Sequence, residues 1–426
     1  MNLTRREFLR GMAGWGGLLV AGSLELRAVR AAEPIRRAHR YLAARQSADG
    51  AWRSGRYAAF REGDVLTPVV LWAMQVEKRE NGMEPVFARG LAWLRALTDR
   101  VALGSNSRAT GDAGGHRAVG AGDTRLPGTD GAVPSSADSE IQSETRGKSG
   151  AQENAWAILR YPLFAASYAA QIFAHSGDHV RAAAWAKIIE VLRTREALGW
   201  PAGDPMCGAW SDASTPPQYV TPVPDMLAPN ISATALAAAA LRAAGGDPQS
   251  ALSFIVRCQN FSDGEPTKFD DGGFFFALDD PIRNKAGRAG RDGRGRERFY
   301  SYGSATCDGY LALRACGLPS EHPRVQAAVE WLRGHSEGLS HGGTWLAGRE
   351  AARASLAFYY GQALAAVLKD IPESTAWIRQ LRAALSSELI ARQSDEGSWQ
   401  GLAPDSCEDE PLVASAFALR TLSLLA

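Results

Sequence analysis

Carboxylates are the side chains of this sequence that could carry acid–base chemistry. Asp308 falls inside a segment that reads as a helix, among apolar neighbours, and a buried carboxyl group there has a raised pKa that suits a general acid. Asp270, Asp271 and Glu410 lie where loops enter helices. At such places a carboxylate also has a purely structural use, because it caps backbone N–H groups and stabilises the helix dipole by about 0.3–1 kcal/mol.

Asp308 cannot be a cap, because it lies in the middle of its predicted helix. An unpaired buried carboxylate costs several kcal/mol. We therefore expect Asp308 to be buried with a hydrogen-bond partner, either as a catalytic acid or as a structural contact.

Aromatic side chains are the second group with chemical potential. An aromatic cage stabilises a carbocation by cation–π attraction, but aromatic residues at helical spacing also simply fill cores. Both interpretations stay open for the candidate ligand contacts, which are Trp156, Tyr168, Phe274, Tyr302, Tyr310 and Tyr359.

Cysteine and histidine form no metal-binding pattern. The five cysteines contain no C-x-x-C pair, their number is odd, and no H-E-x-x-H motif is present. The sequence therefore predicts no metal, no cofactor and no disulfide framework.

A repeat indicates the elements that position these residues. Residues 46–52 and 393–399 both read Q-x-x-x-G-x-W, and the G-x-W ending, with Phe once in place of Trp, recurs at Trp210, Phe274 and Trp345. The later copies are spaced by about the length of two helices of about 15 residues with their loops. Glycine permits a tight turn, and the aromatic ring fills the junction between neighbouring helix pairs.

Two types of helix alternate between these loops. Amphipathic outer helices are expected near 35–46, 84–98, 178–194, 248–258, 322–335 and 374–393. Mostly apolar inner helices are expected at 65–77, 152–175, 230–244, 302–316, 350–368 and 409–425. Pairs that close on themselves expose no apolar face. The pattern predicts an all-α fold, an (α/α)6 toroid of six helix pairs with G-x-W/F repeat loops and essentially no sheet.

Three segments lie outside this pattern. Residues 1–32 have the charged, apolar and small-residue regions of a signal peptide, and Thr4–Arg10 resembles a twin-arginine export signal. Residues 102–150 are rich in Gly, Ser, Thr and Asp and are predicted to be disordered. Residues 279–300 are predicted to form a flexible basic loop, which is either solvated or a lid or anion-binding loop. The remainder, 33–426, is expected to be one domain.

Replacing both Arg5 and Arg6 by lysine is expected to trap the precursor in the cytoplasm, because the twin-arginine pair is the feature that the export route recognises. Fractionation of cells that express either form measures this. An unchanged periplasmic yield in a strain with a working Sec pathway would show that the pair is incidental.

The repeats resemble the QW repeats of the squalene–hopene cyclase and protein prenyltransferase superfamily. Residues 301–306, Ser-Tyr-Gly-Ser-Ala-Thr, are similar to the S-Y-G-S-M-T stretch of exported bacterial prenyltransferase/squalene-oxidase-repeat proteins, and Pro411 to Leu422 resembles their last inner helix. The resemblance implies a toroid with an apolar central cavity that takes an isoprenoid. In protein prenyltransferases an Asp, a nearby Cys and a distant His hold Zn²⁺. Here Cys307-Asp308 supplies an adjacent Cys and Asp, but the region where the His would follow reads Ala-Phe-Tyr-Tyr, residues 357–360. The resemblance therefore implies no zinc site in this chain.

The chemistry of that superfamily transfers less well than its fold. The sequence contains no D-x-D-D motif, whose middle Asp protonates the alkene in triterpene cyclases, and it supplies only one α/α domain where those enzymes use two. Cyclase activity is therefore doubtful, and whether the chain is an enzyme stays open.

Three functions fit the sequence. The first is an exported protein, periplasmic or extracellular, that binds an isoprenoid or other apolar small molecule. The second is a non-catalytic exported binding or scaffold protein, and the third is a polysaccharide lyase or glycosidase on an (α/α) ring. Contact with a membrane surface is compatible with each. The net charge of +1 gives no support for nucleic-acid binding.

Overall fold

The computed structural model describes residues 32–75, 83–101, 155–278, 280–372, 375–402 and 404–426. The predicted insert at 102–150 lies outside these residues, as does the predicted signal peptide apart from its last residue. Within the described ranges we find no helix with the length and hydropathy of a membrane span.

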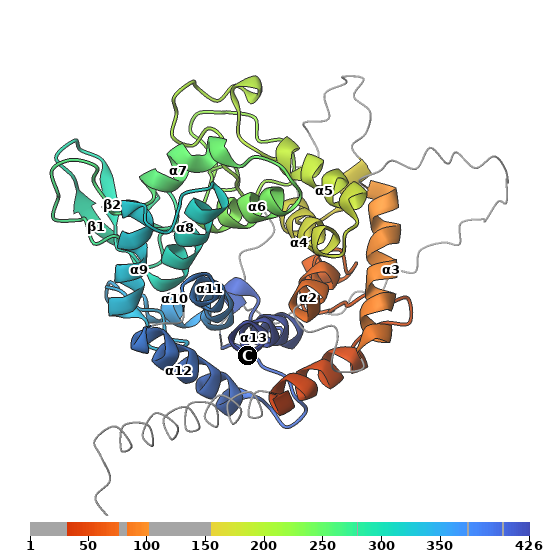
Figure 1. Ribbon diagram of the computed structural model, residues 1–426. Coiled ribbons are helices and arrows are strands. Elements are labelled where there is room, and N and C mark those ends of the chain that lie inside the picture. The colour runs from red at the N-terminus through yellow and green to blue at the C-terminus, as the bar shows by residue number, and fades with distance from the viewer. Residues whose placement is uncertain (1–31, 76–82, 102–154, 279, 373–374, 403) are drawn as a thin grey trace, which may run out of the picture.

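The described chain is mostly helical, as predicted, and its helices form two concentric layers (Figure 1). The outer layer consists of residues 32–44, α3 (Glu84–Val101), α5 (His179–Val191), α7 (Leu252–Arg257), α9 (Pro323–His335) and α12 (Ala376–Arg392). The inner layer consists of α2 (Leu66–Met74), α4 (Pro162–His175), α6 (Ile231–Ala243), α8 (Gly303–Ala315), α11 (Ala357–Asp370) and α13 (Pro411–Leu425). Shorter helical turns are Ala58–Phe60, Ala155–Ile158, Glu196–Leu198, Gln249–Ala251, α10 (Glu350–Ala354) and Pro404–Ser406.

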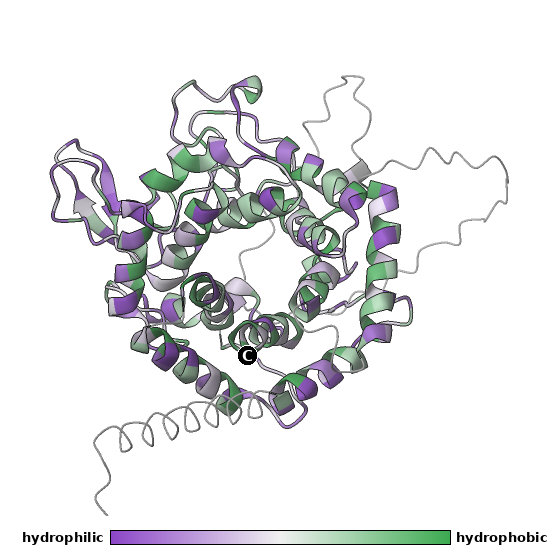
Figure 2. Cartoon of the chain, viewed as in Figure 1, coloured by the Kyte–Doolittle hydropathy of each residue, from purple (hydrophilic) through white to green (hydrophobic). Residues whose placement is uncertain are grey.

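Burial explains why the two layers differ in composition. Every residue of α2 is buried, whereas α3 buries one face that includes Phe87, Leu91, Leu94 and Leu97. Figure 2 shows hydrophilic residues along the outer helices and mostly apolar residues on the inner ones. Each inner helix contacts the next in chain order, and α13 also contacts α2, so the inner helices follow one another around a closed circle.

Three of the G-x-W loops pack a tryptophan against the outer helix that precedes them. The indole rings of Trp52, Trp210 and Trp399 are almost completely buried. Their N–H groups donate to the carbonyl oxygens of Leu42 at 2.7 Å, Ile189 at 2.7 Å and Leu389 at 2.8 Å, which lie on the preceding outer helix. A buried indole N–H needs such a partner. The tryptophan of the repeat therefore fills the junction with its ring and also hydrogen-bonds the preceding helix.

The glutamine of the repeat joins its own loop to the next outer helix. Gln46 Nε2 donates to the carbonyls of Gly50 and Val86, both at 2.9 Å. Gln393 Nε2 donates in the same way to Gly397 at 3.0 Å and to Pro34 at 2.9 Å. Because Pro34 lies in the first helix, this second contact connects the last repeat to the first.

Gln259 is the glutamine of the copy that ends at Phe274, which the sequence pattern did not assign. Its Nε2 donates to the carbonyls of Gly272 at 2.9 Å and Arg324 at 2.8 Å. The glutamine and its glycine are 13 residues apart here and 4 apart in the first repeat. An insertion between them hides the motif.

The repeat glycine is required for two reasons, which Gly397 illustrates. Its φ of +94° lies in the left-handed region, and a Cβ there would stand 2.5 Å from the carbonyl oxygen of Arg37. Gly272 is the same, with a φ of +85° and a Cβ contact of 2.6 Å to the Ala327 carbonyl. Any other residue is both strained and too large where the loop touches the next outer helix.

Trp345 does not take the place that its G-x-W sequence predicts. It is half-buried, and its ring centroid lies 5.4 Å from that of Tyr302 and 6.0 Å from that of His341. Its indole N–H is buried and has no partner among the described residues. The fourth junction therefore lacks the carbonyl contact of the other tryptophans.

Three predicted elements also need correction. The inner helix expected at 350–368 is divided, and its inner part, α11, begins only at Ala357. The inner helix expected at 152–175 begins only at Pro162, because proline is favoured in the first turn and breaks a helix at any later position. The basic segment, expected to be an irregular loop, contains a hairpin of β1 (Arg288–Arg291) and β2 (Glu297–Phe299). Arg288 and Arg291 of this hairpin pair with Glu297 at 2.6 and 2.8 Å.

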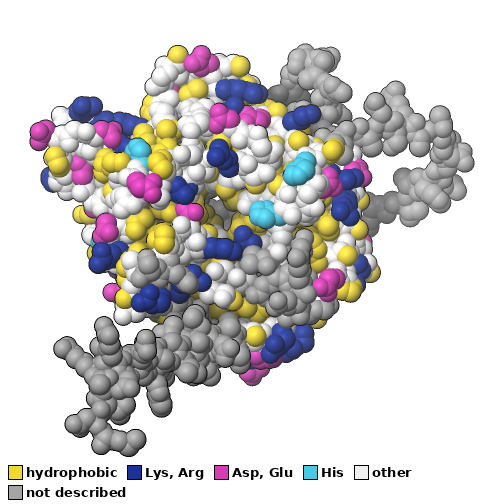
Figure 3. Space-filling view, viewed as in Figure 1, with side chains coloured by type: hydrophobic (Ala, Val, Ile, Leu, Met, Phe, Trp, Pro, Cys, Tyr) yellow, Lys and Arg dark blue, Asp and Glu magenta, His cyan; other side chains and the backbone are white. Residues whose placement is uncertain are grey.

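Acidic and basic side chains are interspersed over the face of the molecule that Figure 3 shows. A nucleic-acid-binding surface gathers charge of one sign, which this face does not do.

Candidate functional site

A cavity of about 540 Å³ lies between the inner helices. The residues that these helices contribute come from their N-terminal halves and are Leu66, Val69, Phe164, Tyr168, Ser232, Tyr359, Val413 and Phe417. Segments that precede the helices complete the wall with Tyr57, Ala58, Ala59, Phe60, Val65, Tyr161, Asp212, Phe276, Lys285, Leu356, Ser406 and Cys407. The cavity therefore opens at the end of the ring where the inner helices begin.

Most of the wall is apolar and aromatic. Tyr359 and Phe417 meet edge to face with ring centroids 5.8 Å apart, and Tyr161 and Phe164 do so at 6.3 Å. Such pairs present both ring faces and ring edges to the space that they enclose.

Asp308 lies directly behind this wall. It is 2% exposed and accepts hydrogen bonds from the hydroxyls of Ser232 and Tyr359, the latter at 3.0 and 3.1 Å to its two oxygens. Burial raises the pKa of Asp308 to about 7, against the opposing effects of these hydrogen bonds and of the positive charge on Lys285. This carboxyl group is therefore partly protonated at neutral pH.

Glu408 binds the backbone N–H of Tyr359, whose hydroxyl contacts Asp308. Its carboxylate accepts from the backbone N–H groups of Phe358 at 3.1 Å and Tyr359 at 2.6 Å, which lie in the first turn of α11. Burial raises the pKa of Glu408 to about 7, although these backbone hydrogen bonds oppose the shift. Two carboxyl groups thus fix Tyr359, one at its backbone and one at its phenol.

Asp212 is a carboxyl group of the cavity wall itself. Its Oδ2 accepts from Asn230 Nδ2 at 3.1 Å and lies 3.6 Å from a guanidinium nitrogen of Arg283. Burial raises the pKa of Asp212, while Arg283, Asn230 and Lys285 act to lower it. The Lys285 ammonium lies 4.8 Å from the ring centroid of Phe276, a cation–π distance.

A layer of larger groups lies one helical turn beyond the lining residues. The Trp72 ring is 5.0 Å from that of Tyr168, and its indole N–H donates to Gln171 Oε1 at 3.2 Å. The Arg420 guanidinium lies 4.1 Å over the Trp72 ring, and burial lowers its pKa to about 10. Trp72, Gln171 and Arg420 belong to α2, α4 and α13 and tie these three helices together.

Comparison with solved structures finds proteins whose fold is similar to that of this chain. The type II terpene cyclase MstE from Scytonema, in complex with geranylgeranyl dihydroxybenzoate (substrate), matches with a TM-score of 0.53 and 12% identity over 94% of this chain and 99% of that one. A structure of the same cyclase in complex with merosterolic acid A (product) matches with a TM-score of 0.52 and 13% identity, over 94% and 98% of the two chains.

These likenesses show a terpene-cyclase-like fold. A glycosidase structure also matches, with a TM-score of 0.42 and 14% identity over 92% of this chain and 96% of that one, which is too low to carry an argument. No protein-family model matches the sequence, and the comparison with curated proteins gave no match.

Two of the six aromatic residues singled out in the sequence, Tyr168 and Tyr359, line the cavity. The other four lie elsewhere. Trp156 is buried in the turn before α4, and Phe274 fills the third repeat junction against Gly309. Tyr302 packs on Trp345, while the Tyr310 hydroxyl donates to Asp370 at 2.8 Å.

The remaining carboxylate candidates have local partners. Asp270 accepts from the backbone N–H and hydroxyl of Thr267 at 2.7 and 3.0 Å. Asp271 accepts from the Gly273 N–H at 2.9 Å and the Ser301 hydroxyl at 2.7 Å. Glu410 is the N-cap of α13 and accepts from the Leu412 N–H at 3.3 Å and from Ser54. None of the three is among the residues that line the cavity.

Sequence reasoning missed Asp212, Lys285 and Tyr57 as parts of the site. Each lies in an irregular segment between helices, where no periodicity shows which way a side chain points. Ser232 was missed for a different reason, because a serine in the first turn of a helix usually serves only as a local hydrogen-bonding group.

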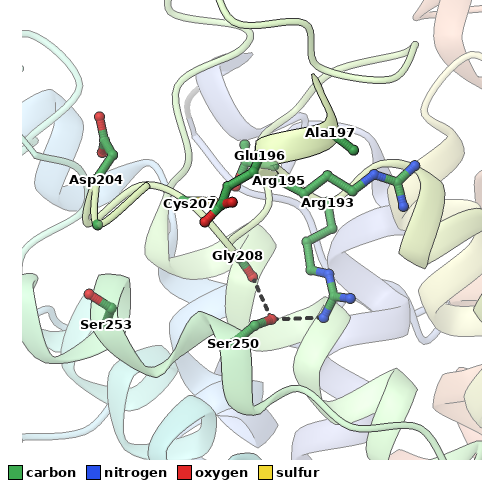
Figure 4. A pocket seen from close by; sticks show the side chains of 11 residues that line it. Arg193, Arg195, Glu196, Ala197, Asp204, Cys207, Gly208, Ser250 and Ser253 are labelled. Atoms are coloured by element: carbon green, nitrogen blue, oxygen red, sulfur yellow. Dashed lines mark hydrogen bonds between the residues drawn. The ribbon is translucent and has the colours of Figure 1, made fainter. Parts of the chain in front are cut away.

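A second hollow of about 500 Å³ lies at the outer surface beside the Trp210 junction (Figure 4). Ser250 there accepts from Arg193 at 2.7 Å and donates to the Gly208 carbonyl at 3.4 Å. Arg193 pairs with Trp210 as Gln46 does with Trp52 and Gln259 with Phe274, so this hollow belongs to the repeat architecture. Across the described chain, no group of three or more His, Cys, Asp or Glu side chains is arranged to hold a metal.

Proposed function

We propose that this chain is an exported (α/α)6 toroid that binds an apolar small molecule of the isoprenoid class between its inner helices. The observation that carries the proposal is the cavity itself, which is lined mainly by aromatic and aliphatic side chains. Its volume of about 540 Å³ falls within the range of small-molecule sites, roughly 300–1,000 Å³. The terpene-cyclase-like fold supports the choice of ligand class, since the MstE structure holds a geranylgeranyl substrate.

The export part of the proposal rests on the twin-arginine-type sequence at residues 4–10. The carbohydrate alternative gains no support from the cavity. Leu66, Val69 and Val413 offer no hydrogen bonds, and sugar hydroxyls buried against them would lose their water partners.

Acid catalysis on the bound molecule is a second candidate, favoured by the pKa of about 7 at Asp308. Asp308 does not line the cavity, so its proton would pass through the Tyr359 hydroxyl. The protonated Asp308 then donates to the Tyr359 oxygen, the reverse of the hydrogen bond that Tyr359 gives to the ionised carboxylate, and the Tyr359 O–H turns to the ligand. Tyr359 gives its proton to the ligand as it takes that of Asp308. Asp308→Asn would abolish any conversion and leave binding in place.

Geranylgeraniol is the probe that tests binding. We expect the purified wild-type chain to bind it, and Ala59→Trp, which places a large ring in the cavity, to weaken binding at least about tenfold, since overpacking a filled site costs about 1–3 kcal/mol. The matched control is Ala384→Trp on the exposed face of α12, which should bind like the wild type.

Isothermal titration calorimetry measures both affinities, and circular dichroism checks that the variants fold. Equal affinities for the two tryptophan variants would place the ligand outside this cavity. A wild-type chain that does not bind geranylgeraniol would remove the isoprenoid proposal.

A further inference from the structure

The polar groups of the cavity gather on one side of the ring. Ser232, Asp308 and Tyr359 belong to the consecutive inner helices α6, α8 and α11, and Asp212 lies in the loop that leads to α6. The helices α13 and α2 contribute Leu66, Val69, Val413 and Phe417. The polar lining residues that precede these two helices, Tyr57 and Ser406, donate their hydroxyls to Asp409 and to the Ser355 carbonyl. An occupant of this cavity therefore meets charged groups on one side and mainly hydrocarbon on the other.

The cations of the polar side already have carboxyl partners. Arg283 lies 3.6 Å from Asp212 and 3.8 Å from Asp280, and the charge of Lys285 acts to lower the pKa values of Asp212 and Asp308. Three carboxyl groups thus share two cations, so a ligand that brings a negative charge into this partly buried space is unfavourable.

Lys285 and Asp212 can supply both the donor and the acceptor that a ligand hydroxyl needs. The ammonium of Lys285 has three N–H donors, so its interaction elsewhere in the protein leaves a donor for a ligand. The hydrogen bond and the ion pair that the described residues give Asp212 both use Oδ2, so Oδ1 is the oxygen that a ligand can reach.

We propose that the ligand is an apolar chain that ends in an uncharged hydroxyl group, which accepts a hydrogen bond from Lys285 and donates one to Asp212. This inference rests on the proposed function and narrows it to isoprenoid alcohols. A carboxylate or phosphate in the same place would be a further anion beside Asp212, Asp280 and Asp308. A hydrocarbon would remove water from Lys285 and Asp212 without replacing its hydrogen bonds.

Phytanol, phytanic acid and phytane test the inference, because they share one carbon skeleton and differ only in the head group. At pH 8 we expect phytanol to bind at least about tenfold more tightly than either of the others, the size of effect that a hydrogen bond to a charged partner gives. Competition against a fluorescent isoprenoid probe measures all three affinities on the same scale.

Two variants test whether Lys285 and Asp212 cause the preference for phytanol. Lys285→Met should weaken phytanol and leave phytane unchanged, and Lys369→Met on the exposed end of α11 is its matched control. Asp212→Asn removes one negative charge and should bring phytanic acid closer to phytanol.

Tight binding of phytanic acid to the wild type would contradict the argument that an anionic ligand is disfavoured, and equal binding of phytane would show that no polar subsite exists. In both cases the isoprenoid proposal itself survives. Failure of all three molecules to bind would overturn both proposals.

Discussion

Replacing Trp399 by alanine is expected to lower the free energy of unfolding by about 3–5 kcal/mol, the usual cost of emptying a buried aromatic site. Trp399 is 1% exposed, and its indole N–H donates to the Leu389 carbonyl at 2.8 Å. It follows Gln393 and Gly397, which touch the first helix at Pro34 and Arg37. The substitution therefore opens a cavity at the junction where the ring closes. Urea denaturation of the wild type and the variant measures the effect.

Trp345→Ala is the matched control, because it removes the same side chain from the same G-x-W pattern. Trp345 is half-buried and its indole N–H has no partner among the described residues, so the loss should be clearly smaller. Trp345→Phe, which removes the unpartnered N–H together with part of the ring, should cost less than Trp345→Ala. Equal losses for the two alanine variants would contradict the distinction between these junctions.

Asp308→Asn is expected to remove a large part of the pH dependence of stability. Burial raises the pKa of Asp308 from 3.8 in the unfolded chain to about 7 in the folded one. The folded protein thus holds this proton more tightly, and the stability that the group contributes is present at low pH and is lost as the pH rises to 7. Relative to the variant, the wild type should lose about 3 kcal/mol between pH 5 and pH 8.

Thermal or urea unfolding at several pH values gives this difference, in which the contributions of Glu408, Asp212 and other shared groups cancel. Asp270→Asn is the control. Burial opposes the shift there, but hydrogen bonds from Thr267 and Ser262 outweigh it, so the pKa of Asp270 is lowered and the group stays ionised across this range. The difference between wild type and Asp270→Asn should therefore not vary with pH. Parallel curves for wild type and Asp308→Asn would mean that Asp308 is not a protonated buried group.

The helices could be predicted from the sequence because the burial of a helix determines which of its residues are apolar. A helix that is buried on all sides, such as α2, must be apolar all round, and one that is buried on one side, such as α3, must be amphipathic. The glutamine of the repeat was visible where Gln and Gly lie 4 residues apart and was not recognised at Gln259, where the same contacts span 13 residues. Spacing shows a motif only while the loop between its parts stays short.

The candidate site could be predicted only in part. The burial of Asp308 followed from its position within a helix, because a carboxyl group there needs a partner, and the structure supplies Ser232 and Tyr359. That Tyr302 and Tyr310 do not line the cavity could not be known, since every face of α8 is covered by some neighbour. Lys285 lies in a segment that the sequence describes only as basic, and its place on the cavity wall depends on tertiary packing.

The contact of Gln393 with Pro34 has a consequence for the way in which this chain unfolds. An open array of helix pairs frays from its two terminal repeats, each of which has a neighbour on one side only. Here the first and last pairs are neighbours, so every pair is supported on both sides and melting has no preferred end from which to begin. Loss of any one junction turns the closed ring into an open array, and the first break should therefore be the cooperative event that makes all later ones easier.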